Sequence, residues 1–474
     1  MRAVWIDYSG LRANGRWLGR RWGVLAACFW LLASVARADD RPGPAAAQKV
    51  RQIQRLIGQL DADARSERIK ARDALLKLGP AILPLLPEDQ TIASAAARQE
   101  LQGIRLRLER DAALASLTPS RVTLKGQYSL RSVLTQITGQ TGNEFDTRNL
   151  DDRLLERPIT VDFHLRSFWS ACDAIVTQLG LAYGSSPGRR LEVVPATHDP
   201  EAHPLAVDDE GTFRVAVTSA SIRPSAVSRS GYALRVSWSL RAEPRLRPLF
   251  AAIGGHDMHA HMADAKLTPP GATQAAIRVL RPISPAAQLE LSMNEGQEPL
   301  RLGTDFEVPA DPAVAPQIDF DGSFAVEMAA GPKQFVFENL AAVDQAPQRA
   351  GSVTVRLRHV DFPAKGSPGD ARVEISVVYD QRGPAFESYR TWIYHNELWL
   401  ETKDGRGLRP RPRVATQAQD DGGIAVEYNF ANVAGSPADF RAVYVAPTLI
   451  TQSPMQFQLR NIPTTRAGQQ GAHP

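Results

Sequence analysis

The apolar residues in the first quarter of the chain recur with the period of an α-helix. The first stripe keeps the i, i+3, i+4, i+7 spacing of one helix face and consists of Ile53, Leu56, Ile57 and Leu60. A second stripe ends at Gly79-Pro80, a pair that stops helices, and a third covers roughly 90–116. The pattern predicts a helical segment over residues 39–118.

The end of the second stripe, Leu-Gly-Pro-Ala at 78–81, resembles a HEAT-like helical pair. A single pair cannot form a solenoid, because each repeat of such a protein buries its apolar face against its neighbours. Two interpretations of this hairpin stay open. It packs as a structural element without a binding role, or it caps the next domain or holds a partner.

Residues 121–195 contain an internal repeat with an offset of 38 residues. Each half reads as strand, helix, glycine and strand. Gly142 and Gly180 stand where the C-cap of a helix requires a positive φ. The segment resembles the short N-terminal (STN) module of secretins and TonB-dependent receptors. This resemblance implies a small α/β module at 119–200 that docks other envelope proteins or lines an assembly.

From Gly211 onward the helical period gives way to short runs in which apolar and polar residues alternate, separated by Gly, Pro, Asp and Asn. Such runs are typical of sandwiches of antiparallel strands. The segments 335–340 (FVFENL) and 457–462 (FQLRNI) match at an offset of 122 residues. We therefore predict two related β-sandwich units, at 208–346 and 347–465.

Each β-sandwich unit is expected to end in its own copy of the repeated strand and to fold separately. The connectors at 200–211 and 346–351 are polar, so we expect proteases to cut there. A loose polar tail follows at 466–474. The chain is thus assigned to the multidomain α+β class, with a helical segment, an STN-like module and two predominantly antiparallel β-sandwich domains.

Three stretches of the second half resemble large exported proteins of planctomycete-like bacteria. They are 384–392 (PAFESYRTW), 396–405 and 457–462. The resemblance implies a similar architecture and an exported location, and it brings no established activity with it.

The N-terminus has the three parts of an export signal. Basic residues up to Arg21 precede a 14-residue apolar run at 22–35, and Ala36-Arg37-Ala38 supplies the small-x-small pattern that signal peptidase accepts. The run is short for a membrane span, which needs about 20 residues. We therefore expect cleavage after Ala38 and a periplasmic or secreted mature chain with no membrane span.

Two alternatives stay open for the leader. The sequence LAAC at 25–28 resembles a lipoprotein box, which would make Cys28 the lipidated first residue. The pair Arg20-Arg21 would fit a twin-arginine signal, although the expected flanking residues are missing.

Charge and cysteine content narrow the classes of function. The formal net charge is +4, but residues 1–38 hold six arginines and one aspartate, so the remainder carries −1. A nearly neutral mature chain argues against a nucleic-acid partner. Without the leader one cysteine remains, Cys172, which cannot form an intramolecular disulfide. Its place on an apolar helical stripe predicts a buried packing residue rather than a nucleophile.

One segment, 256–264 (HDMHAHMAD), concentrates histidines. His259 and His261 are two residues apart, which places both imidazoles on one face of a strand, and His256 and Asp264 lie within loop reach. Imidazole and carboxylate are ligands that Zn²⁺ and related ions prefer. A divalent metal such as zinc is one hypothesis for this segment, and a polar edge strand whose histidines face water is the other. No further cofactor is expected.

A second candidate surface surrounds Trp392. Glu387, Arg390 and His395 would place carboxylate, guanidinium and imidazole groups beside its aromatic face, a combination that binds sugars or peptides. The alternative is ordinary cross-strand pairing on a β surface. The GxSxG match at 184–188 (GSSPG) reads as a hairpin tip before Arg189-Arg190, and the sequence has no P-loop and no GxGxxG that opens a helix after a strand.

These observations favour an exported, non-enzymatic envelope protein that acts as a binding or scaffolding module for other envelope proteins or cell-wall components. The alternative is a metal-dependent or carbohydrate-active periplasmic protein that uses the cluster His256, His259 and His261 or the Trp392 surface. The sequence leaves the question of enzymatic activity open.

Overall fold

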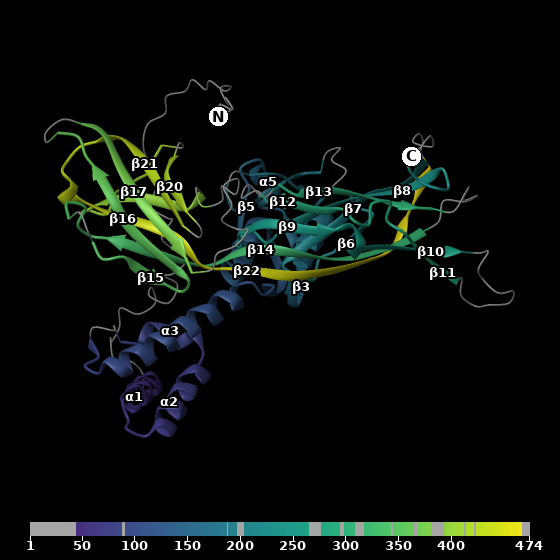
Figure 1. Cartoon of the computed structure of the whole chain (residues 1–474). Coiled ribbons are helices and arrows are strands. Elements are labelled where there is room, and N and C mark those ends of the chain that lie inside the picture. The colour runs from purple at the N-terminus through teal and green to yellow at the C-terminus, as the bar shows by residue number, and fades with distance from the viewer. Residues whose placement is uncertain are drawn as a thin grey trace. The chain divides into compact units, whose positions relative to one another are not determined.

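The structure is a computed structural model that describes residues 44–87, 91–186, 188–196, 203–264, 276–293, 298–308, 317–342, 345–364, 368–380, 393, 395–411, 414–420 and 423–466. These residues form a mixed α+β arrangement in which strands predominate, as predicted (Figure 1). None of the described helices is both long and apolar enough to cross a membrane. The leader, with Cys28 and Ala38, and the tail beyond Arg466 lie outside the described residues, so the predictions of export, cleavage and lipidation stay predictions.

Helices form the first segment at the positions that the apolar period predicts. They are α1 (Pro44–Gln59), α2 (Arg65–Lys77), a 3₁₀ helix (Pro80–Leu85) and α3 (Ala95–Ser116). Their shared core includes Ile53, Leu60, Leu75 and Leu101. Gly79 has a φ of 74°, a left-handed conformation that ends the turn after α2 at little cost for glycine.

The internal repeat of 38 residues appears as two strand–helix–strand halves. The elements of this α/β module are β1 (Arg121–Ser129), α4 (Leu130–Thr141), β2 (Glu144–Asp146), α5 (Asp152–Leu155), β3 (Pro158–Ser167), α6 (Phe168–Leu179), β4 (Leu181–Tyr183) and β5 (Arg190–Pro195). The hydroxyls of Ser129 and Ser167 cap α4 and α6, and Gly142 and Gly180 end them with φ of 72° and 65°. Strand β1 pairs with β3 antiparallel, while β2, β5 and β4 form a three-stranded sheet.

The rest of the described chain is built almost entirely from strands. They are β6 (Ala206–Asp208), β7 (Phe213–Pro224), β8 (Tyr232–Ala242), β9 (Pro248–Gly254), β10 (Met258–Asp264), β11 (Ala276–Leu280), β12 (Gln288–Ser292), β13 (Leu300–Glu307), β14 (Gln317–Phe337), β15 (Gln348–Ala350), β16 (Val353–Asp361), β17 (Gly369–Tyr379), β18 (Glu397–Thr402), β19 (Gly407–Leu408), β20 (Val414–Asp420), β21 (Gly423–Val433), β22 (Phe440–Pro463) and β23 (Thr465–Arg466).

These strands enclose two apolar cores. In the first, a five-stranded sheet with the order β13-β8-β7-β23, and β6 beside β7, packs on one part of an eight-stranded sheet. The eight-stranded sheet has the order β11-β10-β14-β22-β18-β19, with β9 beside β14 and β12 beside β9. In the second core, the sheet β15-β16-β17-β21-β20 packs on the other part of the eight-stranded sheet.

Strands β14 and β22 belong to both cores. They pair antiparallel from Gln317↔Pro463 to Phe337↔Ala442 and run side by side in Figure 1. Phe457, in the second copy of the repeated segment, packs in the first core, whereas Phe335, in the first copy, packs in the second core. The expectation that each unit closes with its own copy is therefore wrong. Similar sequences mark two ends of one long ladder, and the boundary predicted at 346/347 separates residues that share a core.

The two predicted connectors also take part in the fold where the structure describes them. Residues 206–208 form β6, which pairs with β7. Residues 348–350 form β15, and the backbone N–H of Gly351 next to it donates to Glu109 of α3 at 2.8 Å. The polar composition of the two connectors does not prevent them from forming β6 and β15, because short strands on a sheet edge need few apolar residues.

Candidate functional site

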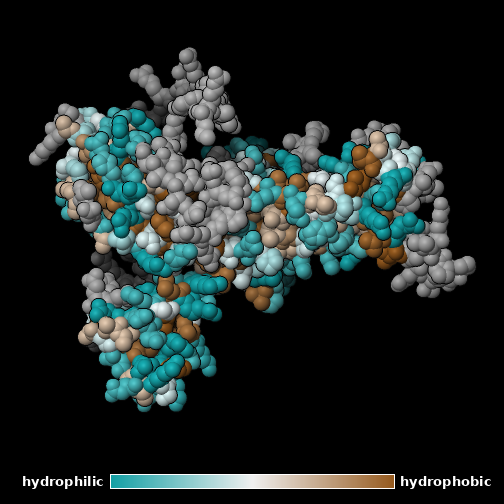
Figure 2. Space-filling view, viewed as in Figure 1, coloured by the Kyte–Doolittle hydropathy of each residue, from teal (hydrophilic) through white to brown (hydrophobic). Residues whose placement is uncertain are grey.

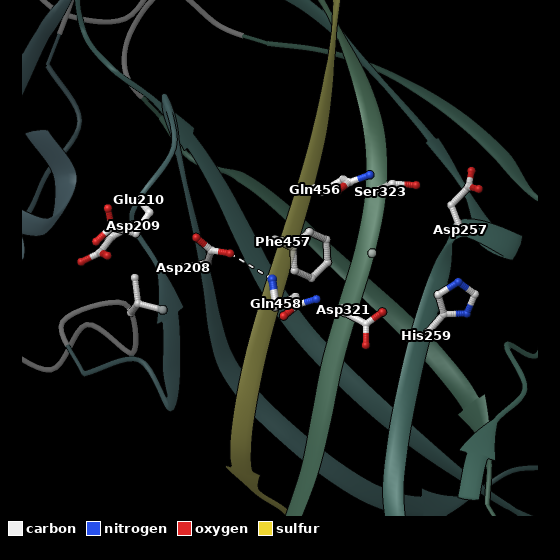
Figure 3. Close-up of a pocket in the computed structure, with 12 residues that line it drawn as sticks. Asp208, Asp209, Glu210, Asp257, His259, Asp321, Ser323, Gln456, Phe457 and Gln458 are labelled. Carbon is white, nitrogen blue, oxygen red and sulfur yellow. Dashed lines mark hydrogen bonds between the residues drawn. The ribbon is translucent and has the colours of Figure 1, made fainter. Parts of the chain in front are cut away.

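A polar groove lies on the outer face of the eight-stranded sheet, above the first core (Figure 3). Its volume is about 640 Å³, and its lining comes from four separate segments: 207–210, Asp257 with His259, 321–323 and 456–458. The ladder of β14 and β22 forms the floor. The end of β6 and the residues after it form one wall, and the turn before β10 with β10 itself forms the other.

The alternation of side chains along the floor strands explains why this face is polar. On β14, Phe320 and Phe324 point into the first core while Asp321 and Ser323 point outward. On β22, Gln456 and Gln458 point outward in the same way. The register places Asp321 opposite Gln458 and Ser323 opposite Gln456, so the four polar side chains form one patch.

The groove is strongly acidic. Five of its twelve lining residues are carboxylates, namely Asp208, Asp209, Glu210, Asp257 and Asp321, and none of the twelve is Lys or Arg. Arg121, outside the lining, offsets part of this charge, because its Nη1 lies 3.6 Å from Glu210. Burial, together with the nearby Asp173 and Glu210, raises the pKa of Asp209.

The predicted histidine cluster borders this groove. Met258, Ala260 and Met262 are buried, so His259 and His261 both point away from the core, on one face as expected. His261 Nε2 contacts Asp321 Oδ1 at 2.8 Å. His256 is exposed on the 3₁₀ turn Gly255–Asp257, and its Nε2 lies 3.2 Å from Asp257 Oδ1.

The metal hypothesis for the same segment stays a prediction. The backbone of Asp264 belongs to β10, but its side chain lies outside what the structure describes. Among the described residues, no group of three or more His, Cys, Asp or Glu side chains is arranged to hold a metal ion.

The Trp392 surface falls mostly outside the described residues, which exclude Glu387, Arg390 and Trp392. His395 is described and exposed. Its neighbour Asn396 is buried and accepts a hydrogen bond from Arg247 Nη1 at 2.7 Å.

The amide of Asn396 also donates to the hydroxyl of Tyr444 at 2.8 Å, and burial raises the pKa of Tyr444 to about 12. These contacts stabilise the second core and do not by themselves form a ligand surface.

The predicted burial of Cys172 is confirmed. The side chain is 2% exposed and packs with Phe168 and Ile175 in the core of the α/β module. Burial raises the pKa of the thiol well above its ordinary value, which keeps it protonated and unreactive.

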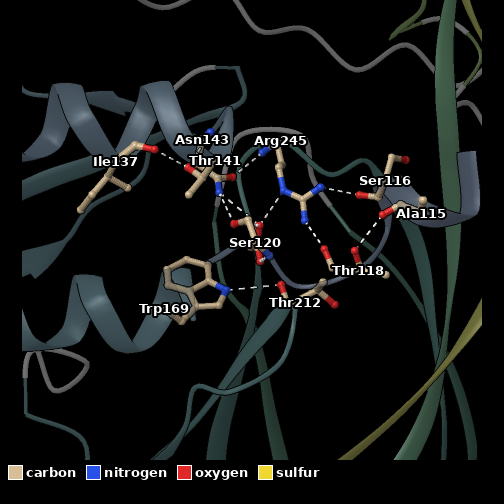
Figure 4. Close-up of polar contacts among 11 residues, drawn as sticks. Ala115, Ser116, Thr118, Ser120, Ile137, Thr141, Asn143, Trp169, Thr212 and Arg245 are labelled. Atoms are coloured by element: carbon tan, nitrogen blue, oxygen red, sulfur yellow. Dashed lines mark hydrogen bonds and ion pairs between the residues drawn. The ribbon is translucent and has the colours of Figure 1, made fainter. Parts of the chain in front are cut away.

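A buried polar joint connects the α/β module, the end of α3 and the first core (Figure 4). Its centre is Glu243, which is fully buried. Glu243 accepts hydrogen bonds from the backbone and hydroxyl of Ser120, from the amide of Asn143 and from Arg245 Nε. Arg245 in turn donates to the carbonyls of Ser116 and Thr118. Such fully paired networks fix the geometry of the parts they join.

Sequence reasoning missed both the groove wall and the joint. The stretch 208–210 has the composition of a linker, and its contacts with α6 and β22 depend on residues far along the chain. One local signal was available for the floor: in DFDGSF at 319–324 acidic and aromatic residues alternate, which predicts a strand with carboxylates on one face.

The exposed apolar residues do not form a stronger candidate for a ligand site than the polar groove. On the face seen in Figure 2 hydrophilic residues cover most of the coloured surface and hydrophobic ones occur in smaller groups. Among the described residues the most exposed large apolar side chains are Val227 (76%), in the turn between β7 and β8, Ile277 (66%) on β11 and Leu165 (60%) on β3. We therefore take the groove as the candidate ligand site among the described residues.

Comparison with known proteins does not assign a function, so the functional argument depends on the geometry of the groove. No family model matches the sequence, and a search of curated proteins returns no significant match.

Proposed function

We propose that the protein is an exported, non-enzymatic binding or scaffolding protein of the cell envelope, and that its groove holds a positively charged segment of a partner protein. The observation that carries the proposal is the composition of the groove: among its twelve lining residues are five carboxylates, one histidine and no Lys or Arg. Carboxylates lining a hollow raise the local concentration of cations and favour a partner of opposite charge.

The size of the groove fits this role. A volume of about 640 Å³ lies within the range of roughly 300–1,000 Å³ that ligand sites occupy. The outward-facing amides of Gln456 and Gln458 add donors and acceptors for a peptide backbone. An extended segment with two or three Lys or Arg residues would place its cations against Asp208, Asp257 and Asp321.

The support for a scaffold comes from the joint around Glu243. It holds the α/β module and the first core together through buried hydrogen bonds. The resemblance of the module to STN modules, which dock other envelope proteins, points in the same direction.

Fluorescence polarisation with a labelled hexalysine peptide tests the groove. We expect the full chain to bind this probe, and binding to weaken by about two- to fivefold for each of Asp208→Asn and Asp321→Asn, the effect of losing one screened charge pair. Asp305→Asn, on β13, is the matched control because Asp305 does not line the groove. No binding by the wild type, or equal loss in the control, would refute the proposal.

A metal-dependent function at His256, His259 and His261 is the competing hypothesis. Elemental analysis of protein purified without chelators separates the two. Stoichiometric zinc that is lost in His259→Ala and His261→Ala would favour the metal-dependent function and count against a purely electrostatic groove.

A further inference from the structure

The acidic wall of the groove is attached to the α/β module by hydrogen bonds at the start of α6. The backbone carbonyl of Asp209 accepts from Ser167 Oγ at 2.7 Å, and the carbonyl of Thr212 accepts from Trp169 Nε1 at 3.3 Å. Trp169 is fully buried, and the hydroxyl of Ser167 also caps α6. The segment from Asp209 to Thr212 therefore takes its position from residues that lie outside the groove.

A buried ion pair holds the next residues in place. Arg214, at the start of β7, is 7% exposed in its side chain and donates through Nε to both carboxylate oxygens of Asp173, at 2.9 and 3.0 Å. The hydroxyl of Tyr183 donates to the same carboxylate at 2.7 Å, and the Arg214 guanidinium lies 5.3 Å from the centre of the Tyr183 ring. Removing one partner of such a pair leaves the other charge buried and unpaired, which is strongly unfavourable.

We propose that the α/β module positions the acidic wall of the groove through the pair Asp173–Arg214, so that occupancy of the groove and docking of the module are coupled. This inference rests on the proposed function. Neither Asp173 nor Arg214 lines the groove, so both act as positioning residues. Coupling between two sites is reciprocal: if the module sets the affinity of the groove, a ligand in the groove must stabilise the docking of the module.

The mechanism needs no large movement. Asp208 accepts a hydrogen bond from the backbone N–H of Gln458 on β22 at 2.9 Å, and Arg121 of β1 lies 3.6 Å from Glu210. The wall is thus held from the floor on one side and from the module on the other. A cation that draws Asp208 and Glu210 toward the floor changes the contacts that Asp209 and Thr212 make with α6.

Hydrogen exchange of the full chain, combined with hexalysine binding, tests the coupling. In Asp173→Asn we expect the amides of 209–212 to exchange about tenfold faster, while those of 318–323 on β14 keep the wild-type rate. We expect the dissociation constant for hexalysine to rise about fivefold or more. If Asp173→Asn does not fold, the milder variant Tyr183→Phe, which removes one hydrogen bond to Asp173, takes its place. It should also speed exchange at 209–212 and raise the dissociation constant for hexalysine. Asp305→Asn, which removes the partly exposed ion pairs of Asp305 with Arg223 and Arg235, is the control.

Reciprocity gives the second arm of the test. In the wild type, saturating hexalysine should slow exchange at 167–173 on α6. Two results would overturn the coupling while the groove proposal stands. One is unchanged exchange at 167–173 in the wild type with hexalysine. The other is faster exchange at 209–212 in Asp173→Asn with unchanged hexalysine binding. A wild type that does not bind hexalysine refutes the groove proposal, and in that case faster exchange at 209–212 still supports the positioning of the wall by Asp173.

Discussion

Replacing Glu243 by glutamine tests whether the buried joint holds the α/β module to the first core. Glu243 Oε1 accepts from the Ser120 N–H at 3.0 Å, and Oε2 accepts from the Ser120 hydroxyl, the Asn143 amide and Arg245 Nε at 2.7, 3.1 and 2.7 Å. Glutamine keeps the volume of the side chain, but one oxygen becomes an NH₂ donor and the negative charge is lost.

The cost follows from these contacts. If the glutamine oxygen takes the place of Oε2, its NH₂ group faces the Ser120 N–H, and one buried donor without an acceptor costs about 1–3 kcal/mol. The bond from Arg245 also becomes a bond to a neutral oxygen, which is weaker by about 1 kcal/mol. We therefore expect the free energy of opening of the joint to fall by about 2–4 kcal/mol.

Native-state hydrogen exchange at the amides of β1 and β7 measures this free energy without assuming that the whole chain unfolds in one step. Glu156→Gln is the matched control, because Glu156 is 60% exposed in its side chain and pairs with Arg131 at 2.7 Å on the surface. The control should change the free energy by less than about 1 kcal/mol. A change below about 0.5 kcal/mol in Glu243→Gln, or one no larger than in the control, would refute the reasoning.

Three further predictions concern the cores and the half-buried carboxyl of Asp209. Cys172→Ala should lower the free energy of unfolding by about 1–2 kcal/mol through the cavity it leaves, and rapid reaction of the native thiol with a polar alkylating reagent would contradict its burial. The raised pKa of Asp209 penalises its ionised form in the folded state, so Asp209→Asn should increase stability in urea at pH 7. The effect should fade as the pH falls and vanish well below pH 3.8, where the carboxyl is protonated in both states; an equal effect at pH 7 and at the low pH would disprove this. The fragment 347–465 should lack a cooperative thermal transition, because Phe335 and Phe337 of the second core lie outside it, and a sharp melt recorded by circular dichroism would show that it folds alone.

Local patterns predicted the elements of the fold better than their partners. The helical period located α2 and α3, and the 38-residue repeat located the two glycines that end α4 and α6 of the α/β module. These features depend on residues a few positions apart, so the sequence shows them directly. The two-residue spacing of His259 and His261 also predicted that both side chains share one face of a strand.

Contacts between residues far apart in the chain could not be predicted from the sequence. The similarity between 335–340 and 457–462 is real, but which core each segment enters depends on the register of β14 with β22. Glu243 stands in a charged stretch, RAEPRLRP at 241–248, and reads as a surface residue until Ser120 and Asn143, more than 90 residues away, are placed beside it. For the same reason the sequence of the acidic wall at 208–210 reads as a connector.

Photocrosslinking from the groove in cells of the native host tests the central claim most directly. A photoreactive residue in place of Gln456, which lines the groove, is compared with one in place of Val378, an exposed position on β17 in the part of the fold that surrounds the second core. The account predicts a discrete adduct with a protein partner from position 456 that is absent from position 378 and is lost when Asp208→Asn and Asp321→Asn are combined. Adducts of the same pattern from both positions, or an adduct that survives the loss of both carboxylates, would contradict it.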